Sequence, residues 1–280
     1  MAKTYSFFRW RNYLIFLLSL AKLTNGFAAG IENIPLGKNV QIGHNSIYAV
    51  SFGEGQNVIF ESGLGASLAN WKNVAPVISK NARVILYDRA GIGNSHFGNP
   101  QQNMRTAQDA VNDLLLLLKQ LNAKPPYILV GHSLGGLYVQ LFAREHPEMV
   151  SGVVLVDSMS PDQMIHDTLP NKKADYYSEA IGITTSEKQV RDAKPFPKKM
   201  PLIVLSATIH GPINGKLNSE INKKRWANWQ EKLSAMSTES QHITANNTGH
   251  CLQLEKPWLV IAAINEIISP SKKSLGCEYK

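Results

Sequence analysis

Cysteine is scarce in this chain: only Cys251 and Cys277 occur among its 280 residues. Two cysteines cannot form the dense disulfide framework that stabilises many small secreted domains. Neither lies at a spacing typical of metal ligands, so we expect neither a metal site nor a bound cofactor. In an oxidising compartment the two could pair with each other or stay reduced, and their spacing alone does not decide between these states.

Long hydrophobic runs are also missing. The most apolar stretch near the N-terminus, residues 13–21, is too short for a helix that crosses a bilayer, which needs about 20 residues. Basic residues up to Arg11 precede it and the small residues Gly26 and Ala28 follow, as in a secretory signal peptide. We therefore expect residues 1–28 to be a signal peptide cleaved after Ala28, and the protein to be secreted or periplasmic. The alternatives are a buried first helix or an uncleaved anchor, the one route by which we expect contact with a membrane.

Acidic residues are absent from the first 28 positions, which hold four basic ones, so about +4 of the formal charge of +8 belongs to the remainder. The other basic clusters, such as Lys198-Lys199 and residues 223–225, accompany no recognised nucleic-acid motif. A solvated basic surface explains them, and no nucleic-acid partner is expected. With 44% hydrophobic and 18% charged residues, the chain has the composition of a globular protein rather than a disordered one.

After the leader, the pattern predicts alternating strands and helices. Strands are expected at 40–42, 47–51 and 58–60, joined by glycine-containing turns at 43–45 and 53–55, which indicates an antiparallel start. Four continuous apolar runs then predict parallel strands buried on both faces: residues 84–87, 127–130, 153–156 and 202–205.

Helical spacing of apolar residues predicts four helices, at about residues 104–121, 134–144, 223–236 and 258–268. The alternation indicates an α/β fold with a doubly wound, mostly parallel sheet and a ligand crevice at the carboxyl ends of its strands. Residues 158–200 lack clear periodicity and exceed the length of ordinary connections. We interpret them as a small cap inserted between two parts of the core, residues 29–157 and 201–280; a long surface excursion is the alternative.

The sequence Gly131-His132-Ser133-Leu134-Gly135 is a G-x-S-x-G pattern placed between a predicted strand and a predicted helix. That context exposes a serine on a sharp turn as a nucleophile. The helix N-terminus directs backbone N–H groups at this position, so Leu134 N–H is the first expected oxyanion donor. The loop after residues 58–60 should supply the second, with Leu64 N–H as the candidate.

A histidine late in the chain completes the expected order of catalytic residues. His250 follows the segment 243–245 and precedes the last predicted helix, where the general base belongs in the order serine, acid, histidine. The other seven histidines have loop or surface positions, or lie inside the turn itself, as His132 does.

The acid is less evident, because residues 200–219 contain no carboxylate where one usually follows a strand. Asp157, directly after the predicted strand 153–156, is the alternative at a strand end and could reach His250 from the neighbouring strand. It would fix the imidazole tautomer and stabilise the imidazolium. A turn cap is the competing role for Asp157, and Asp162 is the second candidate for the acid.

Four motifs together resemble the α/β-hydrolase superfamily, in particular its serine hydrolases of the fold-1 type. They are Gly-His-Ser-Leu-Gly-Gly at 131–136, Tyr-Asp-Arg-Ala-Gly-Ile-Gly-Asn-Ser at 87–95, Val-Asp-Ser at 156–158 and Thr-Gly-His at 248–250. The resemblance implies an eight-stranded sheet and a Ser–His–acid mechanism with an acyl-enzyme on Ser133 and a water activated through His250. Asp88-Arg89 resembles the family's turn beside the active site, and we interpret it as structural.

The serine at the elbow argues against the superfamily's dehalogenases and epoxide hydrolases, which carry aspartate there. The sequence thus predicts an exported serine hydrolase of the carboxylesterase or lipase kind, acting on small-molecule acyl esters. Hydrolysis of lactones, thioesters, peptides or C–C bonds stays open, because fold and triad do not set the substrate. A ligand-binding protein that kept the scaffold without turnover is the other class, motivated by the missing carboxylate after Leu205.

Overall fold

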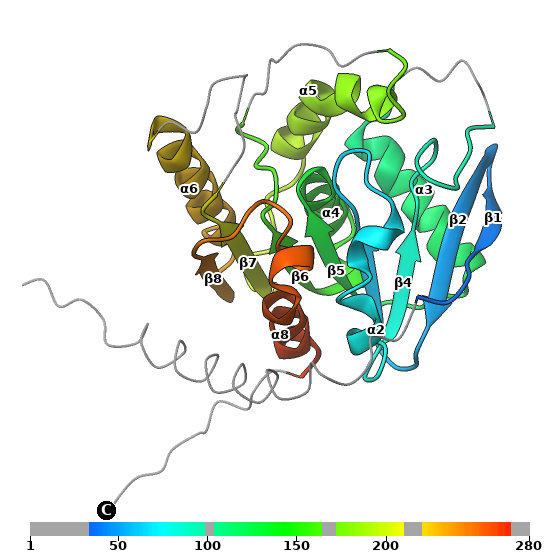
Figure 1. Ribbon diagram of the computed structural model, residues 1–280, viewed down its shortest axis with the longest axis horizontal. Coiled ribbons are helices and arrows are strands. Elements are labelled where there is room, and N and C mark those ends of the chain that lie inside the picture. Colours follow the sequence, from blue (N-terminus) through cyan, green and yellow to red (C-terminus); the bar gives the residue numbers. More distant parts are fainter. Residues whose placement is uncertain (1–33, 99–103, 164–171, 210–219, 270–280) are drawn as a thin grey trace, which may run out of the picture.

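The computed structural model describes residues 34–98, 104–163, 172–209 and 220–269. One eight-stranded sheet forms its centre, in the order β1-β2-β4-β3-β5-β6-β7-β8 (Figure 1). The strands are β1 (Lys38–Ile42), β2 (Asn45–Phe52), β3 (Asn57–Glu61), β4 (Arg83–Tyr87), β5 (Tyr127–His132), β6 (Val150–Val156), β7 (Leu202–Ala207) and β8 (Ser240–Ala245). The mostly parallel α/β sheet expected from the sequence is confirmed.

Helices cover both faces of this sheet. The helices are α2 (Ala75–Ile78), α3 (Ala107–Gln120), α4 (Leu134–Glu145), α5 (Tyr177–Asp192), α6 (Glu220–Ser234), α7 (Leu252–Glu255) and α8 (Pro257–Ile268), with 3-10 turns η1 (Leu68–Trp71) and η2 (Pro147–Met149). Side chains alternate between the two layers, as strand geometry requires. In β5, Leu129 packs with α3 and α4, whereas Ile128 and Val130 pack with α2 and α8. Burial of each such side chain stabilises the fold by about 1.5–3 kcal/mol.

The start of the sheet differs in part from the prediction. β1 and β2 form the expected antiparallel pair, but β2 is followed in the sheet by β4, also antiparallel. β3 lies between β4 and β5 and is parallel to both, so the predicted antiparallel pairing of β2 with β3 is wrong. All five residues of β3 are buried, which suits a central strand, whereas β2 keeps partly exposed positions that suit a place nearer the edge.

Helix α5 (Tyr177–Asp192) lies within the segment 158–200, in which the sequence shows no clear periodicity. It packs on α3 and α4 (Figure 1). Its buried positions include Glu179, Ser186 and Glu187, so polar residues stand where an apolar stripe would have revealed the helix. The hydroxyl of Ser186 is satisfied by two bonds of 2.8 Å, because it donates to Gly182 O within α5 and accepts from Ala107 N–H of α3.

The predicted leader, residues 1–28, and Cys277 lie outside the described residues, so cleavage, export and the disulfide stay predictions. None of the helices in the described ranges is both long and apolar enough to span a bilayer. Over the same ranges, no three His, Cys, Asp or Glu side chains are grouped so that they could hold a metal ion.

Candidate active site

Ser133 stands alone between the end of β5 at His132 and the start of α4 at Leu134. Its backbone has φ 52° and ψ −120°, a conformation that costs a non-glycine residue about 1–3 kcal/mol. Three backbone hydrogen bonds hold it there: Ser133 N–H donates to Val156 O at 3.2 Å, and Ser133 O accepts from Gly136 and Met159 N–H at 3.0 Å each. The turn therefore fixes the serine at the carboxyl end of the central strand.

Close approach of β3 and α4 makes this turn possible. A Cβ on Gly135 would lie 2.4 Å from the carbonyl oxygens of both Glu61 and Ser62, so only glycine fits. On the other side, a Cβ on Gly63 would lie 3.3 Å from Ser133 Cβ. The loop 62–65 after β3 thus lies beside the serine, as the sequence predicts for the second oxyanion donor.

Both predicted oxyanion donors have spare hydrogen-bonding capacity. Neither Leu64 N–H nor Leu134 N–H donates to another protein group among the residues that the structure describes. The Leu134 N–H belongs to the first turn of α4, where helix geometry leaves such groups without an intrahelical partner. Two donors near one serine are the arrangement that a developing oxyanion requires.

Asp157 lies directly after β6, with its side chain fully buried and φ at 42°. Its Oδ2 lies 2.6 Å from Nδ1 of His250. Its Oδ1 accepts from Ala207 N–H at 2.8 Å and from Trp226 Nε1–H at 2.9 Å. These bonds orient the carboxylate and compensate for the loss of solvent around it.

This contact determines which nitrogen of His250 is basic. An ionised carboxylate only accepts hydrogen bonds, so Nδ1 of His250 carries the proton and Nε2 keeps its lone pair. The side chain of His250 is 38% exposed. Its ring centroid lies 5.9 Å from that of Trp226, and the two ring planes are nearly perpendicular, at 84°. The structure therefore brings Asp157 and His250 together, whereas Asp162 pairs instead with Lys232, at 3.3 Å.

Two supporting residues were missed by sequence reasoning. Trp226, on α6, binds the carboxylate of Asp157 from 69 positions away, and no local pattern signals such a contact. His132 is buried, and its Nε2 lies 3.0 Å from the backbone oxygen of His250. Burial, followed by the charge of His250, lowers the pKa of His132 to about 3. His132 is therefore neutral at pH 7, and its Nε2–H donates to that oxygen.

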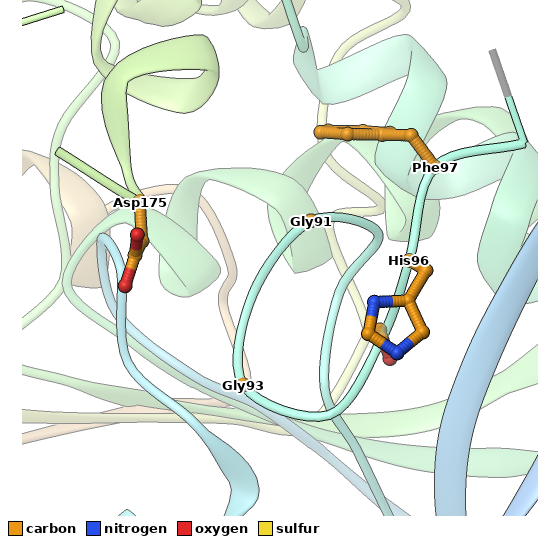
Figure 2. A pocket seen from close by; sticks show the side chains of 6 residues that line it. Gly91, Gly93, His96, Phe97 and Asp175 are labelled. Atoms are coloured by element: carbon orange, nitrogen blue, oxygen red, sulfur yellow. The ribbon is translucent and has the colours of Figure 1, made fainter. Parts of the chain in front are cut away.

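A surface pocket of about 430 Å³ lies elsewhere, on the loop after β4 (Figure 2). Figure 2 shows Asp175 on one side of the Gly91–Gly93 loop and His96 on the other, with the Phe97 ring above. Its lining residues are Gly91, Gly93, Ser95, His96, Phe97 and Asp175. Neither Ser133 nor His250 contributes to it, so we do not assign the substrate to this pocket.

Comparisons with known proteins place this geometry in a wider context. A family model described as alpha/beta hydrolase fold matches residues 56–276. The uncharacterized protein YqjL of Bacillus subtilis (strain 168) is 29% identical over 220 residues, which cover 76% of this chain and 83% of that protein. The 2-hydroxy-6-oxo-6-(2'-aminophenyl)hexa-2,4-dienoic acid hydrolase of Metapseudomonas resinovorans is 32% identical over 121 residues, 42% of this chain and 40% of that enzyme.

Solved structures give the same picture of the fold. A thermophilic esterase from Thermogutta terrifontis is similar with a TM-score of 0.60 and 17% identity, covering 83% of this chain and 97% of that one. At this identity the likeness concerns the fold alone.

Proposed function

Because the chain belongs to the alpha/beta hydrolase fold family, we propose that it is an exported serine hydrolase of carboxylic esters that uses Ser133, His250 and Asp157. The family and its hydrolase relatives support hydrolysis in general. The finer proposal depends chiefly on one observation, the 2.6 Å contact between Asp157 and Nδ1 of His250. Asp157 and the strained Ser133 follow the carboxyl ends of two neighbouring parallel strands, β6 and β5.

The reaction follows from the tautomer. Nε2 of His250 accepts the hydroxyl proton of Ser133 while Oγ attacks the acyl carbonyl, and Asp157 stays ionised beside the imidazolium. The N–H groups of Leu134 and Leu64 stabilise the oxyanion. His250 then protonates the leaving alkoxide, the ester C–O bond breaks, and an acyl-enzyme remains on Ser133. Water, deprotonated by His250, releases the carboxylic acid and restores the serine.

The rest of the proposal concerns the whole chain. Residues 1–28 direct export, residues 158–200 cap the core between residues 29–157 and 201–280, and a small acyl compound is the partner. The charge pattern and the G-x-S-x-G elbow support this assignment, and helix α5 in the capping segment supplies a layer over α3 and α4.

Two other functions compete with esterase activity. The first is cleavage of C–C bonds; its support is the similarity to one relative that is named as a dienoic acid hydrolase. A ligand-binding protein without turnover is motivated by the absence of a carboxylate after β7. The contacts of Asp157 with His250, Ala207 and Trp226 weaken that motive, since the carboxylate that follows β6 lies within hydrogen-bond distance of Nδ1 of His250.

A substrate panel distinguishes the three. The protein without the predicted leader is assayed with p-nitrophenyl esters of increasing acyl length and with a dienoic C–C substrate, beside a Ser133→Ala variant. We expect ester turnover that falls at least about a thousandfold in the variant. Turnover of the C–C substrate alone would replace the esterase proposal, and a folded protein inactive on both would favour the binding protein.

A further inference from the structure

A buried group of charges lies beneath the loop 62–65. Arg89 follows β4, and only 5% of its side chain is exposed. Its guanidinium binds Glu61, at the end of β3, with Nη1 2.7 Å from Oε1. It also binds Glu179 of α5 as a fork, through Nε to Oε1 and through Nη2 to Oε2 at 2.9 Å.

Burying charged side chains costs free energy of desolvation, and their mutual attraction often fails to exceed that cost. A gain in stability is therefore a weak explanation for this buried group. Burial opposes the charge on Arg89, but Glu179 and Glu61 outweigh burial and raise the pKa of Arg89, so the guanidinium stays charged. Burial raises the pKa of Glu61, while Arg89 and the hydroxyl of Tyr87 act against that rise. The same side chains also form hydrogen bonds with the backbone of the loop 62–65.

Arg89 and Glu179 hold the backbone of the loop beside Ser133. Arg89 Nη1 donates to Ser62 O at 2.5 Å and Nη2 donates to Gly63 O at 2.7 Å. Glu179 Oε2 accepts from Gly65 N–H at 3.0 Å. Three of the four loop residues, Ser62, Gly63 and Gly65, are thus attached to the Arg89–Glu179 ion pair, in which Arg89 comes from the loop after β4 and Glu179 from α5.

The peptide between Gly63 and Leu64 is trans, so its C=O and its N–H point in opposite directions. Arg89 holds the carbonyl of Gly63, which directs Leu64 N–H away from Arg89. A turn bond from Ala66 N–H to the same oxygen, at 3.1 Å, fixes the carbonyl further. Gly63 itself lies against the elbow, since a Cβ there would lie 2.8 Å from Nδ1 of His132 and 3.3 Å from Cβ of Ser133.

We propose that Arg89 and Glu179 are positioning residues that aim Leu64 N–H at the oxyanion formed on Ser133, and that α5 must be seated on the core for this donor to be in place. The inference rests on the proposed function and deepens it. A lysine cannot replace Arg89 here, because the contacts require several N–H donors in one rigid plane. Helix α5, which carries Glu179, then acts on the chemical step.

The test uses Arg89→Lys and Glu179→Gln, with Tyr87→Phe as the matched control. The control removes a hydroxyl that donates to Glu61 in the same buried group, whereas the bonds to the loop come from Arg89 and Glu179. For each protein, kcat and KM are measured on the ester that the unmodified protein hydrolyses best, and active sites are counted by exhaustive fluorophosphonate labelling. The Ki of a trifluoromethyl ketone, which forms a tetrahedral oxyanion on the serine, is measured alongside.

We expect kcat per active site to fall at least about tenfold in both variants, with KM changed less than about threefold. Affinity for the ketone should fall in parallel, while Tyr87→Phe stays within about twofold. A kcat per site within about threefold of the unmodified protein in Glu179→Gln would overturn the inference, as would unchanged ketone affinity. If Arg89→Lys does not fold, Glu179→Gln decides. Absence of labelling and turnover in the unmodified protein would instead contradict the proposed function.

Discussion

At the scale of single residues, the decisive feature is the carboxylate of Asp157. One of its oxygens accepts from Ala207 N–H and Trp226 Nε1–H, which leaves the other for His250. Both groups that face Oδ1 are N–H donors, which cannot accept a hydrogen bond. A side chain placed here is therefore forced to turn an acceptor toward Ala207 and Trp226.

The variant Asp157→Asn tests whether this fixed orientation sets the tautomer of His250. The amide oxygen will face Ala207 and Trp226, so the NH₂ group will face Nδ1 of His250 and force the proton onto Nε2, where it blocks proton transfer from Ser133. We expect kcat per active site to fall about 10³–10⁴-fold with little change in folding. Asp162→Asn, on the exposed carboxylate that pairs with Lys232, is the control and should stay within about twofold. The opposite ranking of the two variants would make Asp162 the acid.

His132 gives a second prediction at this scale, on stability against pH. Its pKa is about 3 in the folded protein and 6.5 when unperturbed, chiefly because it is buried. Between these values the unfolded chain binds a proton that the folded chain does not, so the free energy of unfolding falls as the pH falls, by about 1.4 kcal/mol per pH unit. Urea unfolding from pH 7 to 4 should show this slope, and His132→Gln, which has no titrating ring, should reduce the total loss by about 2–3 kcal/mol. Equal slopes in the two proteins would contradict the assignment.

At the scale of elements, the approach of α4 to β3 positions both the serine and the oxyanion loop. Gly135→Ala would place a methyl group 2.4 Å from the backbone oxygens of Glu61, at the end of β3, and Ser62, just after it, where no flexible side chain can give way. We expect a loss of about 3 kcal/mol or more in the free energy of unfolding. Gly43→Ala, in the β1–β2 turn, is the matched control: φ is +52° but nothing lies within 4 Å, so it should cost only about 1–2 kcal/mol. Equal losses, measured by urea unfolding, would remove close approach as the cause.

The same scale shows what the sequence could and could not predict. Strands β4 to β7 were predictable because each contains a continuous apolar run, and Ser133 because its turn is encoded within five residues. Strand β8, with the polar sequence Ser-Gln-His-Ile-Thr-Ala, gave no such signal. Helix α5 was not, because Glu179 and Ser186 occupy buried positions and erase the apolar stripe. The contact of Trp226 with Asp157 was not either, since it joins segments that only the folded sheet brings together. Arg89 was interpreted as structural, and its bonds to the loop carbonyls became visible only in three dimensions.

At the scale of the whole molecule, we predict export with loss of the leader. Expressed with its own N-terminus in a bacterial host, the protein should be recovered from the cell envelope or medium beginning at Ala29. Ala28→Phe should block or shift the cut, because the residue before the cleavage site must be small. N-terminal sequencing and intact mass distinguish the products. A protein that retains residues 1–28 in both forms would favour the anchor instead.

The most direct measurement of the central claim is the site of a covalent fluorophosphonate adduct, found by peptide mapping of the labelled protein. Only a serine activated by a base beside oxyanion donors reacts rapidly with such a probe. The account predicts one adduct per chain, on Ser133, absent in Ser133→Ala and strongly slowed in His250→Ala. A folded protein that hydrolyses esters yet carries the adduct on another residue, or carries none, would contradict it.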